Sequence, residues 1–256
     1  MGGCLLAVLI AAHVSAEDEP GRYAVLVGVS RYESPDLDLL RYPENDVVEL
    51  AQVLRDAGFP SADVKVMTET NAVGSSSLRP TGVNIRRELE NLVSRAKPRD
   101  RVVLAFAGHG VQFKGDNESY FCPADANLKD RKTLLPIEEI YSDLELCEAD
   151  VKLIFVDACR NELDPNTRTA LSVHLDTTTR TKNRMPPGGL AAFYSCSPGE
   201  VAYEDPHLGN GVFFHFVVDG LRGKADLDDD EQITLPELEQ YVKRQTSAHV
   251  QDGFGG

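Results

Sequence analysis

Residues 101–110 read RVVLAFAGHG and residues 151–160 read VKLIFVDACR, and these two stretches decide the fold. Each begins with a short apolar run rich in valine, isoleucine or phenylalanine, which predicts a buried strand. The first run ends at Ala107 and leads into His109, and the second ends at Val156 and leads into Cys159. We therefore expect an imidazole and a thiol just past the carboxyl ends of two buried strands. A nearby imidazole can take the proton of a thiol and return it later.

The segments on both sides of these stretches alternate between strand and helix patterns. Further buried strands are predicted at 23–29, 64–68 and 190–194. Helices with one apolar face are predicted at 43–57, 81–96, 136–147 and 212–221. This alternation predicts an α/β fold with a mostly parallel central sheet and helices on both faces. Sites in such sheets form beyond the carboxyl ends of the strands, where His109 and Cys159 are expected.

The charge balance limits the partners of the protein. The 256 residues include 26 Lys and Arg and 41 Asp and Glu, which gives a net charge of −15. A surface this acidic repels a phosphate backbone, so no nucleic-acid partner is expected. No apolar run approaches the roughly 20 residues that cross a bilayer, so no membrane span is predicted. The cysteines form no CxxC pair, and no cofactor motif such as a P-loop is present, so no cofactor is expected to be required for the chemistry.

We expect three parts along the chain. Residues 1–20 form a leader and linker, because the apolar stretch from Cys4 to Ala12 is followed by Val14-Ser15-Ala16, which resembles a signal-peptide cleavage site. Export is therefore predicted, although no basic residue precedes the apolar stretch, and a cytoplasmic location is the alternative. Residues 21–222 form the main domain, and residues 223–256 form an acidic loop followed by the C-terminal helix.

The two decisive stretches, taken together, resemble those of caspase-like cysteine peptidases. His-Gly follows one apolar block and Ala-Cys follows another, and His109 and Cys159 are 50 residues apart, a spacing known from caspases. Asp157-Ala158-Cys159-Arg160 stands where animal caspases have Gln-Ala-Cys-Arg-Gly, which is closest to the bacterial, metacaspase-like branch. The resemblance covers residues 21–242 and implies a caspase-like fold with protein or peptide substrates.

The resemblance also implies roles for individual residues. Cys159 matches the nucleophile and His109 the general acid and base, and the backbone N–H groups of Gly110 and Cys159 would form the oxyanion hole. Asp157 and Asp46 match the carboxylates that hold a Lys or Arg side chain of the substrate. Two carboxylates at strand ends attract a cation on physical grounds as well.

Arg41 and the loop at residues 161–188 bear on substrate preference and on self-processing. Arg41 lies close to where animal caspases place the arginine that selects an acidic substrate residue, so it opposes the basic preference. Residues 161–188 form a long polar loop of the kind that is open to proteolysis. If the pocket is acidic, we expect the enzyme to cut this loop itself after Arg180, Lys182 or Arg184.

An acidic segment near the C-terminus resembles an EF-hand calcium loop. The candidate calcium ligands, at loop positions 1, 3, 5, 7, 9 and 12, are Asp226, Asp228, Asp230, Gln232, Thr234 and Glu237. Position 6 is Glu231, where such loops have glycine, and this costs about 1–2 kcal/mol in a left-handed turn. The alternative is that Thr234 and Glu237 form a capping box for the last helix, preceded by a solvated acidic loop.

The predicted function is that of a cysteine endopeptidase that cleaves after Arg or Lys through the Cys159–His109 dyad. One alternative is a catalytically silent caspase-like module that binds or scaffolds other proteins. Another is a gingipain-like or legumain-like peptidase, since these families share the same block pattern and the same dyad.

Overall fold

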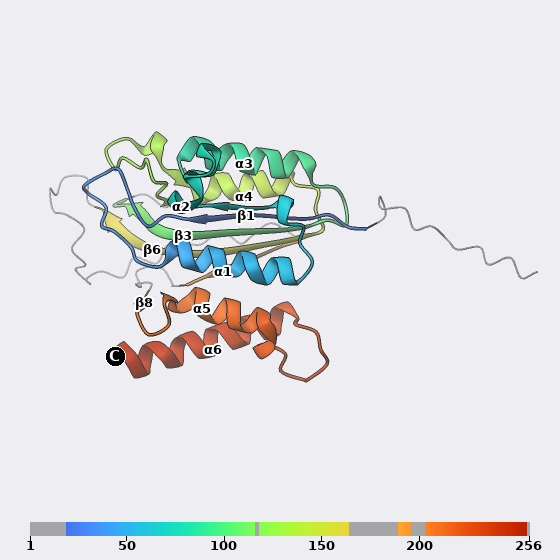
Figure 1. The fold of residues 1–256 in the computed structure, drawn as a ribbon. Helices are drawn as coiled ribbons and strands as arrows, with labels where there is room; N and C mark the ends of the chain where they lie inside the picture. Colours follow the sequence, from blue (N-terminus) through green and yellow to red (C-terminus); the bar gives the residue numbers. More distant parts are fainter. Residues whose placement is uncertain (1–18, 116–117, 164–188, 196–202, 255–256) are drawn as a thin grey trace, which may run out of the picture.

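The described chain is a sheet of parallel strands between two layers of helices (Figure 1). The computed structural model describes residues 19–115, 118–163, 189–195 and 203–254, with side chains left out at 159–163 and 254. Five strands run parallel, in the spatial order β2 (Val64–Met67), β1 (Arg22–Gly28), β3 (Arg101–Phe113), β6 (Val151–Leu163) and β7 (Leu190–Tyr194). Two short strands, β4 (Ser119–Phe121) and β5 (Leu135–Pro136), add antiparallel pairs beside the far half of β3. The mostly parallel sheet and the helices on both faces confirm the predicted fold class.

Helices α3 (Gly82–Arg95) and α4 (Ile137–Leu146) cover one face of the sheet, and α1 (Pro43–Asp56) and α5 (Val212–Asp219) cover the other (Figure 1). Helix α6 (Leu235–Phe254) packs on the outer side of α5, and α2 (Glu69–Ala72) is a single turn after β2. A second, two-stranded sheet consists of β8 (Glu204–Asp205) and β9 (Asn210–Gly211). It comes directly before α5 in the chain.

The start and end signals in the sequence explain where the main helices lie. Pro43 is the first residue of α1, where its missing N–H has no cost, and Glu44 and Asp46 in the first turn favour the helix dipole. The Thr81 hydroxyl accepts a hydrogen bond from the Asn84 N–H and caps α3. The predicted helices are thus confirmed, with boundaries that differ by one or two residues.

The two central strands are longer than the sequence predicted. They were expected to end at Ala107 and Val156, but β3 continues to Phe113 and β6 to Leu163. The apolar run of β3 ends before Gly108, and a glycine there permits a tight turn. In the structure Gly108 has a φ of 154° inside the strand, and a Cβ atom there would lie 2.8 Å from the Tyr32 hydroxyl. The glycine therefore permits a close approach of another segment and does not end the strand.

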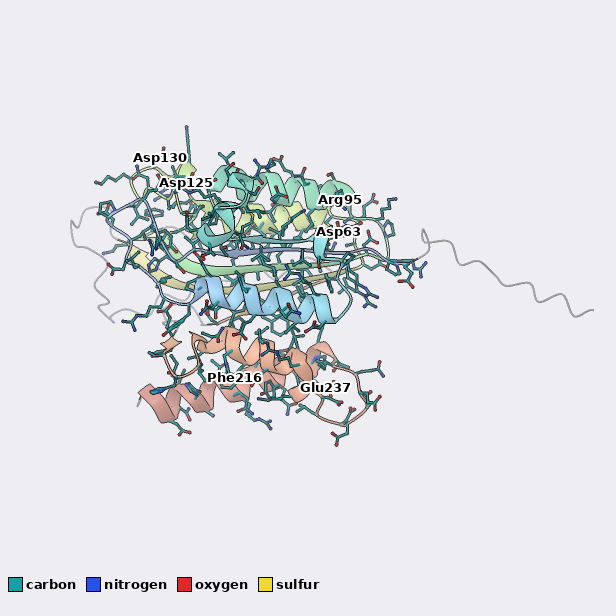
Figure 2. All side chains as sticks on the ribbon, viewed as in Figure 1. Asp63, Arg95, Asp125, Asp130, Phe216 and Glu237 are labelled. Atoms are coloured by element: carbon teal, nitrogen blue, oxygen red, sulfur yellow. The ribbon has the colours of Figure 1, made fainter. Side chains whose placement is uncertain are left out.

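The amino-terminal end of the sheet is held by one ion pair and by hydrogen bonds to an aspartate. The Arg95 guanidinium, at the end of α3, lies 2.7 Å from the Asp63 carboxylate, just before β2 (Figure 2). Asp100 precedes β3 and accepts hydrogen bonds from the N–H groups of Gly21 and Lys97. His109 and Cys159 lie at the opposite, carboxyl-terminal end of the sheet.

The contact between β1 and α1 generates a prediction about stability. A Cβ atom on Gly28 would collide with the backbone of Pro43 and come within 2.8 Å of Val47, and the helix backbone cannot yield as a side chain can. We expect Gly28→Ala to lower the free energy of unfolding by about 1–3 kcal/mol, measured by urea denaturation. Gly74→Ala is the control, because a Cβ there would have its nearest neighbour at 3.8 Å. Equal stability of the two variants would contradict the packing described here.

Candidate active site

The register of the sheet brings the backbones of His109 and Cys159 side by side. His109 pairs directly with Cys159 between β3 and β6, while β1 ends at Gly28, opposite Ala107. Both residues therefore lie inside the long central strands and two positions beyond the end of β1, not just past strand ends as predicted. Neighbouring residues in register share one face of a sheet, so positions 109 and 159 lie on the same face. The thiol itself is outside the described side chains.

The imidazole of His109 is oriented by a backbone carbonyl. Its Nε2 atom lies 2.9 Å from the carbonyl oxygen of Asp38. Because a carbonyl only accepts hydrogen bonds, Nε2 carries the proton, and Nδ1 holds the lone pair of the neutral ring. Burial lowers the pKa of His109, against the opposing effects of the Asp38 carbonyl and of the Asp38 and Glu204 charges. The ring is therefore suited to accept a proton at Nδ1 near neutral pH.

The backbone of Gly110 faces the strand that carries the cysteine. The His109 carbonyl accepts a hydrogen bond from the Cys122 N–H, on the β4 side of β3. Backbone groups alternate in direction along a strand, so the Gly110 N–H points to the other side, toward β6. Since β3 and β6 are paired in register at this position, the Gly110 N–H is directed at the backbone of β6. The oxyanion-hole role expected of Gly110 stays a prediction, together with the same role for the Cys159 N–H.

The two predicted substrate-binding carboxylates, Asp46 on α1 and Asp157 on β6, converge on Gly211, at the start of α5. A Cβ atom on Gly211 would lie 2.7 Å from Oδ2 of Asp157 and 3.0 Å from Oδ2 of Asp46. The Gly211 N–H and the Asn210 side-chain amide both donate to Oδ1 of Asp46. The exposed fractions are only 2% for Asp46 and 8% for Asp157. The structure therefore brings together two residues that are 111 positions apart in the sequence.

Both carboxyl groups hold their protons more tightly than usual. Burial raises the pKa of Asp157 to about 6, with Glu204 adding to the rise and the Ser195 hydroxyl opposing it. Burial, followed by the charge of Asp157, raises the pKa of Asp46. Among the described residues, Oδ1 of Asp157 has no partner in hydrogen-bond geometry. A cation placed between the two carboxylates would relieve both the burial and the repulsion.

Glu204 is a member of this site that the sequence pattern did not indicate. Its carboxylate accepts hydrogen bonds from the backbone N–H groups of Arg41 and Tyr42, at the entrance to α1. Its charge acts on His109, Asp46 and Asp157. The Arg41 side chain is exposed and forms no ion pair with the described residues, so it does not neutralise the carboxylates. Asp38 was also missed, because it acts through its backbone carbonyl, which any residue could supply.

The acidic loop before α6 combines both arrangements expected of it. Glu237 accepts hydrogen bonds from the N–H and the hydroxyl of Thr234, and the Glu237 N–H donates back to that hydroxyl, as in a capping box. Carboxylate oxygens of Asp226, Asp228 and Glu237 also lie within 4.8 Å of one another. Glu231 has a φ of 64°, so position 6 takes the left-handed turn in spite of its side chain. Calcium binding by this loop stays a prediction.

Two predictions concern residues that lie outside the described part of the chain. They are the exported leader, at residues 1–18, and the processing sites Arg180, Lys182 and Arg184.

Two other cysteines lie in the core. Cys122 and Cys147 are free and buried, and burial raises the pKa of Cys122 to about 12. No helix within the described ranges is long and apolar enough to cross a membrane.

Comparisons with known proteins agree with the resemblance stated from the sequence. The family described as caspase domain matches residues 21–252. Metacaspase-6 of Arabidopsis thaliana is 32% identical over 114 residues, which are 41% of this chain and 30% of that protein. Among solved structures, pro-Sf-caspase-1 has a TM-score of 0.55 at 16% identity, over 91% of this chain and 80% of that one. Protein GSU0716 of Geobacter sulfurreducens has a TM-score of 0.61 at 14% identity, over 88% and 89%. The chain spans less than a third of the length of the metacaspases it matches first.

The raised pKa of Asp157 predicts how stability depends on pH. Since the folded-state pKa of about 6 exceeds the ordinary value of 3.8, this carboxyl favours folding below pH 4, and the contribution is lost as the pH rises toward 6. Asp157→Asn should therefore be more stable than the natural chain at pH 7, by up to about 3 kcal/mol, and equally stable at pH 4. Thermal denaturation at both pH values measures this. The exposed Asp150→Asn is the control and should show no such difference.

The acidic loop predicts a response to calcium. Repulsion by Asp230, followed by burial and Glu237, raises the pKa of Asp228, so a divalent cation bound there should raise the melting temperature. Asp228→Ala should abolish this response and should not lower the melting temperature in EDTA, because it removes a repelled charge, with Mg²⁺ as the control ion. If millimolar Ca²⁺ has no effect on the natural chain, the loop serves only as the cap of α6.

Proposed function

Because the chain belongs to the caspase-domain family of peptidases, we propose that it is a cysteine endopeptidase that cleaves after Arg or Lys through Cys159 and His109. The observation that carries the proposal is the convergence of the Asp46 and Asp157 carboxylates at Gly211. Asp157 lies two residues before Cys159 on β6. No cofactor is required in this proposal. The acid–base work is assigned to the imidazole and the electrostatic work to backbone N–H groups.

The proposed reaction follows from the orientation of the imidazole. His109 takes the thiol proton at Nδ1 while Nε2–H stays bonded to the Asp38 carbonyl. The thiolate attacks the carbonyl carbon of the substrate, and the negative oxygen that forms is held by the N–H groups of Gly110 and Cys159. The imidazolium then protonates the departing amine. Water, deprotonated by the same ring, hydrolyses the thioester and restores the thiol.

The proposed specificity follows from the charges around the pocket. Asp46, Asp157 and Glu204 face a P1 side chain with three carboxyl groups, and the Arg41 side chain offers no compensating charge there. An acidic P1 residue would add a fourth negative group, whereas a basic one would ionise carboxyls that burial otherwise keeps partly protonated. The guanidinium of Arg can bind two carboxylates with its planar fork, so we expect Arg to be preferred over Lys.

Turnover of peptides with different P1 residues tests the proposal. With fluorogenic peptides carrying Arg, Lys, Asp or Leu at P1, we expect cleavage after Arg and Lys and none by Cys159→Ala. Asp157→Asn should lower kcat/KM for the Arg peptide by roughly a hundredfold, about 2.7 kcal/mol, while Asp150→Asn leaves it unchanged.

Other outcomes of that experiment separate the alternatives. Cleavage after Asp but not Arg would contradict the acidic pocket and assign P1 recognition to Arg41. No cleavage of any peptide, with a folded and alkylatable Cys159, would favour a silent binding module.

A further inference from the structure

The backbone of His109 is held by a tyrosine hydroxyl at the point where its neighbouring strand ends. The last hydrogen bond from the β1 side joins the Val29 N–H to the Ala107 carbonyl, 2.9 Å apart. Backbone groups of alternate residues face the same side, so the next N–H on this side belongs to His109. With β1 already past its end, that N–H donates instead to the hydroxyl of Tyr32, at 2.7 Å.

The Tyr32 hydroxyl bridges the two backbone groups at the point where the pairing of β1 with β3 stops. It accepts from the His109 N–H and donates to the Val29 carbonyl at 3.1 Å, so a single oxygen joins the end of β1 to β3. If β1 continued in register, the Val29 carbonyl would accept from the His109 N–H directly. Gly108 makes room for this bond, because a Cβ atom there would lie 2.8 Å from the hydroxyl oxygen. The Tyr32 ring also contacts the imidazole of His109, with centroids 5.0 Å apart.

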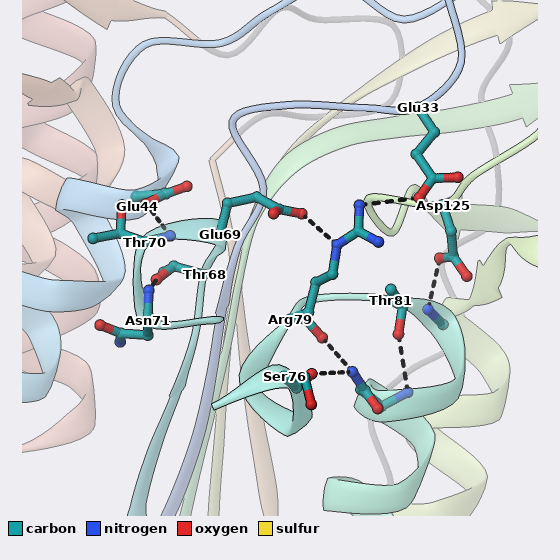
Figure 3. A network of polar contacts seen from close by, with 12 residues as sticks. Glu33, Glu44, Thr68, Glu69, Thr70, Asn71, Ser76, Arg79, Thr81 and Asp125 are labelled. Atoms are coloured by element: carbon teal, nitrogen blue, oxygen red, sulfur yellow. Dashed lines mark hydrogen bonds and ion pairs between the residues drawn. The ribbon is translucent and has the colours of Figure 1, made fainter. Parts of the chain in front are cut away.

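The loop that carries Tyr32 is fixed to the rest of the protein. The Glu33 N–H donates to the Ala124 carbonyl at 2.8 Å. The Glu33 carboxylate pairs with Arg79 at 3.0 Å, and Arg79 also pairs with Glu69 at 3.1 Å (Figure 3). The same loop includes Asp38, whose carbonyl orients the imidazole at Nε2. One loop therefore holds both the backbone and the ring of His109.

We propose that Tyr32 is a positioning residue for catalysis, which acts by fixing the backbone of His109 through its hydroxyl. This inference rests on the proposed function of His109 as the general base. The position of a side chain depends on the position of its backbone. Small errors in the position of a general base lower the rate of proton transfer. The hydrogen bonds of Tyr32 described above go to Val29 and His109, so we expect its effect to fall on the chemical step and not on substrate binding.

The test removes the hydroxyl and keeps the ring. Tyr32→Phe leaves the His109 N–H and the Val29 carbonyl without this partner, and we expect kcat to fall about tenfold with KM changed less than twofold. Tyr120→Phe is the matched control. Its hydroxyl donates to the carboxylate of Glu118, two residues earlier in the chain, and kcat should not change. Gly108→Ala, which pushes against the same hydroxyl, should lower kcat at least as much as Tyr32→Phe.

The outcomes are read at a temperature where circular dichroism shows every variant fully folded. An unchanged kcat in Tyr32→Phe, or a rise in KM that accounts for the whole loss, would overturn the proposal. If the natural chain cleaves no peptide, the proposed function fails, but the alkylation rate of Cys159 by iodoacetamide still reports on the base. Cys159→Ala corrects for the other thiols. Slower alkylation in Tyr32→Phe supports the positioning role, and an equal rate overturns it.

Discussion

The parallel pairing of β3 with β6 is the constraint on which the candidate active site depends. It runs without interruption from Arg101 and Val151 to Phe113 and Leu163. Strand β1 leaves the sheet at Gly28, so beyond Ala107 the two central strands extend past the carboxyl edge that β1 defines. In this extension the register alone sets His109 beside Cys159. A shift of one residue would move one member of the pair to the opposite face of the sheet.

The electrostatics of the carboxyl pair formed by Asp46 and Asp157 oppose folding. The two groups are buried beside each other, and the raised pKa of Asp157 means that its ionised form destabilises the folded protein at neutral pH. Two local features offset part of this cost for Asp46. It lies in the first turn of α1, where the helix dipole favours a negative charge, and it accepts hydrogen bonds from Asn210 and Gly211. The burial of the Asp157 carboxylate is offset by fewer hydrogen bonds. A bound cation would therefore stabilise the charge of Asp157 more than that of Asp46.

The sequence indicated the parts of this site that a local pattern can carry. Apolar runs at 101–107 and 151–156 predicted the central strands, and the motifs around His109 and Cys159 predicted their neighbourhood. Residues that reach the site from distant parts of the sequence were missed. The Asp38 carbonyl has no side-chain signature, and Glu204 reaches the site only because the β8–β9 hairpin folds back on the start of α1. The strand ends were missed because pairing between β3 and β6, and not the local sequence around Gly108, decides where these strands stop.

The β8–β9 hairpin connects the carboxylate of Asp46 to the C-terminal helix α6. Glu204, Asn210 and Gly211 of this hairpin contact the start of α1, while the neighbouring Asp205 binds Nε2 of His249 on α6 at 2.7 Å. The His207 N–H and this contact with His249 lower the pKa of Asp205, which keeps its carboxylate ionised. Helix α6 begins at the acidic loop and is about 30 Å long, so the loop and the pocket hairpin lie at opposite ends of one rigid element. The hairpin that contacts Asp46 is thus bonded to a helix whose own start is capped by Thr234 and Glu237.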